Sequence, residues 1–432
     1  MMTITELQQR YAAHPNVEAM SGLLKNPSVR TLFCGGLCAS AASLFSSVLV
    51  QRGEFPFVFI LGDLEEAGYF YHDLTQVLGT DKVLFFPSSF RRAIKYGQKD
   101  AANEILRTEV LSRLQKGEEG LCVVTYPDAL AEKVVSRKEF GDKTLKLHSG
   151  ENVDTNFIME VLRSYGFEYV DYVYEPGQYA VRGSIIDVFS FSSEFPYRID
   201  FFGDEVESIR TFEVETQLSK EKKDSIVIVP DLSRSLEQGG ANGMVSFLDF
   251  LSADAVLAMR DLLWLRERIQ TVHDETLTPQ AIAAREAEES GCITLDGKLI
   301  DGSEFTLRAL DFRRMEFGNK PTGTPDATIT FDTSAQPIFR KNFDMVAESF
   351  KEYMEKGYAL YICSDSMKQT DRIRAIFEDR GDQIAFTAVE RTLHEGFADN
   401  ALRLCIFTDH QLFDRFHKYN LKSDKARSGK VA

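Results

Sequence analysis

The fold of this chain is decided by the stretch from residue 175 to residue 217, EPGQYAVRGSIIDVFSFSSEFPYRIDFFGDEVESIRTFEVETQ. Runs rich in Ile, Val, Phe and Tyr alternate here with turn residues at Pro176-Gly177, Ser192-Ser193 and Gly203-Asp204. This pattern is typical of a β-meander, because extended apolar runs are separated by short reversals. We therefore expect at least three antiparallel strands.

The run YRIDFF, residues 197–202, separates two faces of one strand because successive side chains point to opposite sides. Tyr197, Ile199 and Phe201 form an apolar face. Arg198, Asp200 and Phe202 form the other face, and this combination of guanidinium, carboxylate and aromatic ring is favoured at protein interfaces. The alternative is an ordinary hairpin with a solvated charged face and with Phe202 folded over a local minicore.

The turn fixes which side chains oppose each other on this hairpin. If Gly203 and Asp204 form a two-residue turn, Asp200 lies opposite Glu207 and Phe202 lies opposite Glu205. Two carboxylates then face each other. We expect either a different register or a cationic partner at this point.

Two runs within this stretch, QYAVRGSIIDVF (178–189) and PYRIDFFGDE (196–205), resemble the signature of the UvrB-homology module. That module is shared by the excision-repair helicase UvrB and the bacterial transcription-repair coupling factors. The resemblance implies a small α+β domain that binds the damage-recognition protein UvrA. It places Arg182, Arg198 and Phe202 at UvrA-contacting positions, with Asp200 between the last two. We expect alanine at Arg182 or Arg198 to weaken UvrA binding with little loss of stability.

A second motif begins with an expected strand at residues 31–34, a glycine-containing turn and an apolar-periodic helix, which is typical of the entry to a P-loop α/β domain. A working P-loop reads GxxxxGK[ST], in which the lysine neutralises phosphate charge. The frame starting at Gly36 has Ala41 for the second glycine and Ala42 for the lysine, and it keeps Ser43. We therefore expect a helix start that does not support ATP hydrolysis.

The other half of such a nucleotide site is an Asp-Glu pair that follows a buried strand. In this chain the residues that follow the expected strand 255–259 are Arg260 and Asp261. Because a magnesium site needs oxygen ligands, an arginine there repels the metal. We expect no cofactor in this chain, and the resemblance implies that ATP and magnesium belong to motor domains outside it. The alternatives are ATP-dependent DNA translocase or helicase activity, or direct binding of damaged DNA, within this chain.

The patterns and the resemblance together predict an α/β fold. A degenerate P-loop, helicase-like (RecA-like) domain carries an inserted small α+β domain and is followed by a second small α/β domain. The resemblance extends to residues 391–397 and 408–413, and so covers essentially the whole chain. The expected segments are 1–136 (first part of the P-loop-like domain), 137–217 (inserted UvrA-binding domain), 218–335 (completion of the first domain and a linker) and 336–432 (second α/β domain with a C-terminal linker).

Composition limits the function classes. The net charge of −16 and the pI near 5.1 argue against a free-standing duplex binder, whose phosphate contacts need a basic surface. Arg91, Arg92 and Lys95 form one small basic cluster, which we expect to be a solvated face. The six cysteines form no CxxC pair, and no apolar run approaches the length of a membrane span. We expect a cytoplasmic protein without a membrane segment.

Three residues near the end of the chain invite a metal-site interpretation. His394, Asp409 and His410 carry suitable ligand atoms, but their spacing matches no known cluster, so we expect structural roles and no metal. The resemblance implies UvrA as the partner, and RNA polymerase and duplex DNA as further partners of a full-length family member. It implies that the chain recruits UvrA to DNA where RNA polymerase has stalled at a lesion.

Overall fold

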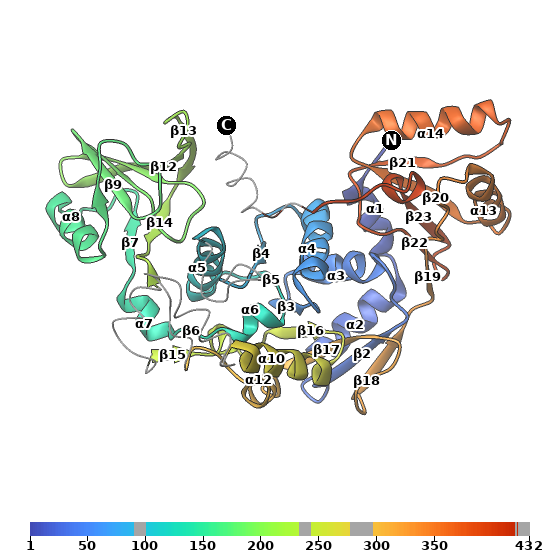
Figure 1. Cartoon of the computed structure of the whole chain (residues 1–432), viewed down its shortest axis with the longest axis horizontal. Helices are drawn as coiled ribbons and strands as arrows, with labels where there is room; N and C mark the ends of the chain where they lie inside the picture. Colours follow the sequence, from blue (N-terminus) through green and yellow to red (C-terminus); the bar gives the residue numbers. More distant parts are fainter. Residues whose placement is uncertain (90–100, 233–242, 277–296, 420, 422–432) are drawn as a thin grey trace.

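The structure is a computed structural model that describes residues 1–89, 101–232, 243–276, 297–419 and 421 (Figure 1). It has an α/β fold with a seven-stranded central sheet and two six-stranded sheets. Figure 1 shows the two six-stranded sheets on different sides of the central sheet. The cluster Arg91, Arg92 and Lys95 lies outside the described residues.

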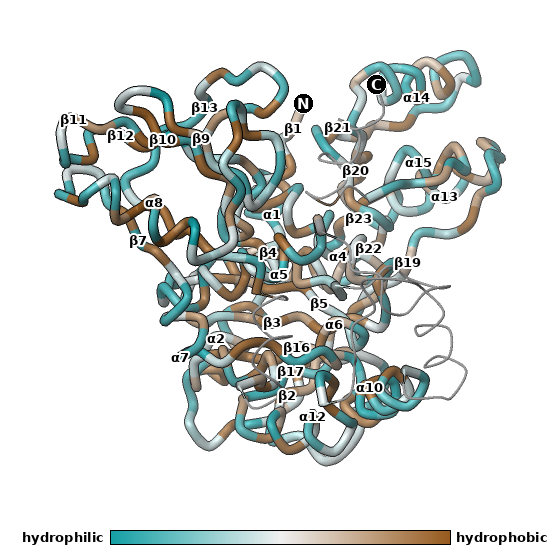
Figure 2. Tube along the Cα trace, turned by 60° about the vertical axis from the view of Figure 1, so that its left-hand side comes forward, coloured by the Kyte–Doolittle hydropathy of each residue, from teal (hydrophilic) through white to brown (hydrophobic). Residues whose placement is uncertain are grey.

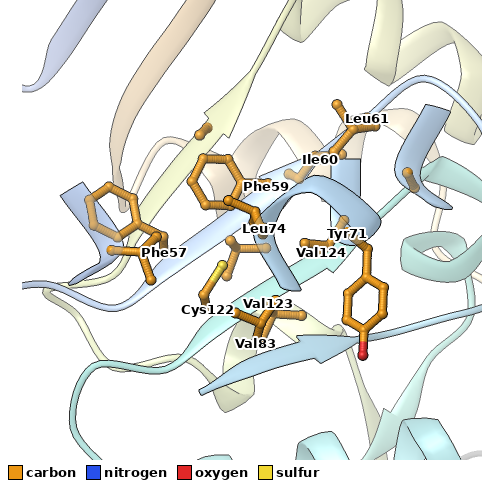
Figure 3. Close-up of a cluster of buried hydrophobic side chains, with 14 of the residues drawn as sticks. Phe57, Phe59, Ile60, Leu61, Tyr71, Leu74, Val83, Cys122, Val123 and Val124 are labelled. Atoms are coloured by element: carbon orange, nitrogen blue, oxygen red, sulfur yellow. The ribbon is translucent and has the colours of Figure 1, made fainter. Parts of the chain in front are cut away.

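The central sheet is parallel throughout. Its strands read as unbroken apolar runs, such as FVFI at 57–60, because helices cover both faces. Figure 2 shows these apolar residues along β3 and β16, and Figure 3 shows Phe57, Phe59, Val123 and Leu74 packed together. In spatial order the strands are β18 (Ala327–Thr330), β2 (Thr31–Gly35), β17 (Arg313–Gly318), β16 (Val256–Met259), β3 (Phe57–Ile60), β5 (Cys122–Thr125) and β4 (Val83–Phe85).

The crossover helices divide between the two faces of this sheet. Because parallel crossovers are right-handed, helices on connections that run toward β4 lie on one face and those on connections that run back lie on the other. The first group is α3 (Ala41–Arg52) and α4 (Leu64–Leu78), and α1 (Ile4–Tyr11) and α2 (Pro15–Lys25) pack against α3. The second group is α5 (Ala101–Gln115), α10 (Leu262–Thr276) and α12 (Gly302–Ala309), with α6 (Pro127–Ala131) against α10.

Between β5 and β16 the chain builds a separate six-stranded sheet, here called the ribbon sheet. Its neighbouring strands are antiparallel except for β8 and β9, so the expected meander is confirmed. The helix α8 (Thr155–Ser164) packs on one face of this sheet through Ile158 and Leu162. In spatial order its strands are β13 (Ser219–Lys223), β12 (Glu205–Phe212), β11 (Tyr197–Phe202), β10 (Ile185–Val188), β9 (Gln178–Arg182) and β8 (Glu168–Tyr169).

Short elements connect the ribbon sheet to the central sheet. The helix α7 (Arg137–Asp142) lies between two small strand pairs, and the 3₁₀ helix η2 (Phe247–Phe250) leads toward β16. The pairs are β6 (Val134–Val135) with β15 (Met244–Val245) and β7 (Leu145–His148) with β14 (Ser225–Ile228).

The hairpin register agrees with the sequence expectation at the turn and departs from it further along. Phe202 pairs with Glu205, as expected for a turn at Gly203-Asp204. Asp200 pairs with Ser208, so the expected pairing with Glu207 is wrong. The physical reason is a β-bulge: the register shifts between Asp200 and Phe201, and β12 therefore contributes one extra residue there. The bulge removes the carboxylate pair expected from a regular ladder.

The third sheet belongs to the C-terminal part of the chain, with one exception. Its edge strand β1 is formed by the first residues of the chain and pairs in parallel with β21. The helices of this part are α13 (Phe343–Glu355), α14 (Met367–Asp379) and α15 (Asp409–Leu412). In spatial order the strands are β1 (Met2–Thr3), β21 (Thr387–Glu390), β20 (Ala359–Ser364), β23 (Leu404–Thr408), β22 (Phe397–Asp399) and β19 (Thr333–Ala335).

One hydrophobic core extends from the central sheet to one face of the third sheet, and a separate cluster that includes Phe350 and Phe407 packs on the other face. The largest cluster of buried side chains runs from the central sheet through α1 and α3 to Tyr361, Val389 and Ile406 of the third sheet. Polar contacts follow the same route, since the Arg10 guanidinium donates to the Tyr361 hydroxyl at 2.6 Å. Within the described residues, no helix combines the length and the apolar character needed to cross a bilayer.

Gly36 makes the turn between β2 and α3 possible. Its φ is +84°, and a Cβ built on it meets the carbonyl oxygen of Phe331 at 1.9 Å. Gly53, at the end of α3, also has a positive φ of +65°, but no atom lies within 4 Å of its Cβ position. A side chain at Gly36 would therefore meet both an unfavourable φ and a backbone collision, whereas a side chain at Gly53 would meet only the unfavourable φ.

We predict that Gly36→Ala lowers the free energy of unfolding by about 2–4 kcal/mol, because a backbone collision adds to the cost of a positive φ. The matched substitution Gly53→Ala costs about 1 kcal/mol. Urea denaturation of both variants measures the difference. Equal losses would contradict the close approach at Phe331.

Candidate functional site

A buried carboxylate organises the face of the ribbon sheet opposite α8. The Asp187 side chain is 1% exposed and stands directly opposite Arg198 on the neighbouring strand. Arg198 donates from Nε to Asp187 Oδ1 at 2.9 Å and from Nη2 to Oδ2 at 3.1 Å. Arg182 donates to the same Oδ2 at 2.5 Å. Two of the sequence-predicted binding residues therefore share one buried counterion.

Arg198 is held in place on every side. Its Nη1 donates to the backbone carbonyl of Gln217 at 2.8 Å, and the guanidinium lies over the Phe212 ring at 4.3 Å from the centroid. Only 17% of the side chain is exposed. In contrast to the sequence expectation, we therefore expect Arg198→Ala to lower the stability, because alanine removes the main partner of a buried carboxylate.

The remaining predicted residues are more accessible. Phe202 is 76% exposed, so the alternative of a local minicore is wrong. The Arg182 side chain is 38% exposed and lies over the Tyr172 ring, which is itself 51% exposed. Asp200 accepts a hydrogen bond from Ser184 Oγ at 3.0 Å. Arg182, Tyr172 and Phe202 thus form an exposed edge beside the turns at 183–184 and 203–204.

Three of the six residues predicted for a degenerate nucleotide site come together. Ala42, Ser43 and Arg260 line one pocket of about 400 Å³. The Arg260 side chain is 71% exposed and forms an ion pair with Glu66 at 3.0 Å. Asp261 does not face a ligand, because it caps α10 by accepting from the backbone N–H groups of Leu263 and Trp264.

This pocket is dominated by acidic groups. Among its lining residues Arg260 is the one arginine or lysine, and burial has lowered the pKa of the histidine, His394, to about 4. Burial, reinforced by the charge of Asp73, raises the pKa of Glu395. A triphosphate would meet net negative charge here. The acidic lining residues are Asp63, Glu65, Glu66, Asp73 and Glu395.

The start of α3 is covered by the third sheet's loop at residues 391–396, and we call this contact the seam. The backbone N–H of Ser40 donates to the Glu395 carbonyl at 3.2 Å, and the Glu395 N–H donates to Ser40 Oγ at 2.9 Å. The Cys38 N–H donates to Thr333 Oγ1 at 3.1 Å. In a working P-loop, backbone N–H groups at this place bind phosphate. In this chain these N–H groups donate to protein atoms. Gly36 allows the turn before α3, and Ala41 is buried in the core.

Asp73 on α4 completes the seam. The Ser40 and Ser43 hydroxyls each donate to its Oδ2 at 2.7 Å, and the backbone N–H of His394 donates to Oδ1 at 2.8 Å. Asp73 is 4% exposed. Sequence reasoning missed Asp73 and Asp187. For Asp187 the available signal was a lone carboxylate within the apolar run 185–189, with its arginine partners on the neighbouring strands. The partners of Asp73 lie on distant segments.

The two histidines considered as metal ligands also meet. His394 and His410 lie together with His417, and the three offer ring nitrogens within 4.8 Å of one another. Asp409 has a different role, since its Oδ2 accepts from Ser364 Oγ at 2.7 Å. His417 was not predicted from the sequence, because it lies in an irregular segment after α15.

We predict that Asp187→Ala lowers the free energy of unfolding by about 3 kcal/mol, because it leaves Arg198 half-buried without its counterion. Arg182→Ala costs less than about 1 kcal/mol, since that side chain is partly solvated. Chemical denaturation measures both. The exposed turn residue Asp204 supplies the control: Asp204→Ala stays within about 0.5 kcal/mol of the parent chain. A similar value for Asp187→Ala would refute the role given to this ion cluster.

Comparison with known proteins gives a family match at the ribbon sheet. Residues 145–233 match the family described as the UvrB interaction domain. The transcription-repair-coupling factor of Bacillus subtilis (strain 168) is 31% identical over 196 residues, which is 45% of this chain and 16% of that protein. The corresponding factor of Escherichia coli (strain K12) is 28% identical over 198 residues, covering 45% and 17%.

A longer match covers most of the chain. The transcription-repair-coupling factor of Staphylococcus aureus (strain bovine RF122 / ET3-1) is 21% identical over 460 residues, which covers 91% of this chain and 39% of that protein. The chain thus spans well under half the length of the curated relatives it matches. Residues 145–233 thus match the UvrB interaction domain, and the chain is similar, over most of its length, to part of the bacterial transcription-repair-coupling factors.

Proposed function

We propose that this chain is the UvrA-recruiting part of a transcription-repair coupling factor. In this role it brings UvrA to DNA where RNA polymerase has stalled at a lesion. The single observation that carries the proposal is the match of residues 145–233 to the UvrB interaction domain. The matched residues include all six strands of the ribbon sheet, on which the predicted contact residues lie.

The exposed edge supplies the surface chemistry for such a contact. Phe202 offers a large apolar group in water, and Arg182 offers a partly free guanidinium next to the aromatic Tyr172. Aromatic and arginine side chains are enriched at binding hot spots. Arg198 and Asp187 act mainly by holding Arg182 and the strand ends in position, with Asp200 fixing the 183–184 turn.

We further infer that the first α/β unit derives from a RecA-like motor whose nucleotide site has decayed. The frame at Gly36 lacks its lysine, the pocket is acidic, and the helix start is occupied by the 391–396 loop. In the same proposal, the ribbon sheet is an insertion into this α/β unit. This chain then carries out no chemistry with ATP or magnesium. RNA polymerase and duplex DNA are then partners of other parts of a full-length protein.

We predict that Phe202→Ala weakens UvrA binding by about 2 kcal/mol, roughly thirtyfold in Kd, because it removes an exposed apolar anchor. Its free energy of unfolding stays within about 0.5 kcal/mol of the parent chain. Surface-immobilised UvrA and the whole chain give the affinity directly. The matched control is Phe157→Ala, since Phe157 is 51% exposed on α8, over the other face of the ribbon sheet. Unchanged affinity in Phe202→Ala, or equal loss in both variants, contradicts the proposed edge.

We predict that calorimetric titration of the chain with magnesium and ATP gives no saturable heat. The physical reason is that a triphosphate finds five carboxylate residues and one arginine around the pocket. The same titration into Glu66→Gln, which removes one of these charges and the partner of Arg260, controls for electrostatic exclusion. Saturable, magnesium-dependent binding by the parent chain contradicts the decayed site and favours a motor activity.

A further inference from the structure

Three histidines meet beside the seam from segments that are separate in the sequence. His394 lies in the 391–396 loop, His410 in α15, and His417 in the extended segment that follows. One ring nitrogen from each lies within 4.8 Å of the other two. The Nδ1 atoms of His394 and His417 are 3.0 Å apart, and the rings of His410 and His417 stack with centroids 4.2 Å apart.

The hydrogen bond of His410 leaves its second ring nitrogen for a ligand, and because its ring is nearly parallel to that of His417, one of the two rings must turn for both to bind the same ion. The Nε2 atom of His410 lies 2.6 Å from the backbone carbonyl of His394, so this nitrogen carries the proton and donates it. Nδ1 then carries the lone pair. It is buried, makes no hydrogen bond among the described residues, and lies 3.7 Å from Asp409 Oδ1. Histidines that bind metals commonly donate their other ring N–H to a carbonyl in this way, which fixes the tautomer and the ring orientation.

A fourth imidazole approaches from the central unit. His72 on α4 has its ring centroid 4.8 Å from that of His417. Its Nδ1 also makes no hydrogen bond in the described part of the chain, and it lies 3.7 Å from Asp73 Oδ1. Two buried imidazole nitrogens near the cluster thus make no hydrogen bond, and this is costly unless they bind something, because a buried polar atom loses its hydration.

Negative groups lie close to the cluster. The carboxylate of Asp73 lies next to His72, and the carboxylate of Asp409 lies next to His410. Their charge favours a bound cation.

We propose that His394, His410 and His417 bind one divalent transition-metal ion of the zinc class, with His72 or a water molecule at the fourth position. Imidazole ligands select such ions over magnesium or calcium, which prefer oxygen. This differs from the sequence expectation of no metal, which considered Asp409 in place of His417. The ion is a structural staple, since it ties the segment after α15 to the 391–396 loop.

Tyr69 of α4 connects the histidine cluster to the central α/β unit. The Tyr69 hydroxyl donates to the His417 carbonyl at 2.6 Å, and its ring stacks on His394 with centroids 3.4 Å apart. Metal binding at the three histidines therefore orders the surroundings of the seam from both sides. The site is independent of the UvrA-binding proposal, because the ribbon sheet contributes none of its residues.

The test uses the whole chain after treatment with a chelator. Titration with zinc chloride, followed by calorimetry and by competition with a chromophoric chelator, is expected to show one equivalent bound and a raised melting temperature. Replacement by cobalt(II) is expected to give the visible absorption of a four-coordinate site with nitrogen ligands. His417→Asn is expected to lower zinc affinity at least about 10- to 100-fold. It is the chosen variant because His417 is only half-buried.

His148→Asn is the matched control, because His148 is an exposed histidine on the ribbon unit and its loss leaves zinc affinity unchanged. Circular dichroism establishes that each variant is folded. The proposal is overturned if the parent chain binds no zinc, or if zinc binding is the same in His417→Asn and His394→Asn as in the parent. A cobalt spectrum without four-coordinate character also overturns it, and that measurement needs no variant.

Discussion

The structure depends above all on the buried carboxylate of Asp73. It accepts hydrogen bonds from two serines at the start of α3 and from the backbone of the 391–396 loop. A buried charge is tolerated only when donors surround it, so these three partners must stay together. Asp73 thereby joins the first α/β unit to the third sheet at the place where a P-loop would bind phosphate. The same contact that stabilises the two units also occupies the helix start at which a working P-loop would hold phosphate.

Asp187 is the corresponding buried carboxylate in the ribbon sheet, and its burial affects which side chains are free to bind a partner. Its partners are two guanidinium groups, one largely buried and one partly exposed. Three of the five N–H donors of Arg198 are already used inside the sheet. A binding partner cannot recruit that guanidinium without competing with Asp187 and Gln217. In the proposed contact with UvrA, the binding role therefore falls to the groups that lack such internal bonds, above all Phe202.

Local patterns were enough to predict much of this fold. The alternating run at 197–202 and the turn at Gly203-Asp204 gave the hairpin and the pairing of Phe202 with Glu205. They failed at Asp200, because a bulge depends on how two strands fit together and leaves no mark in either strand alone. Likewise the apolar runs predicted buried parallel strands, whereas nothing local indicates that β1 joins β21 nearly 390 residues away.

The candidate sites show why residue type alone does not predict which side chains are available for binding. Arg198 and Arg182 are the same residue type on neighbouring parts of the sheet. Arg198 is a structural donor, because it also contacts Gln217 and Phe212, whereas Arg182 lacks these contacts and is partly exposed. The same reasoning separates Asp409 from His417: the carboxylate is used by Ser364, while the imidazole meets two others. A side chain is free for function only after its internal partners are counted. That count comes from contacts between distant segments, which the folded chain alone supplies.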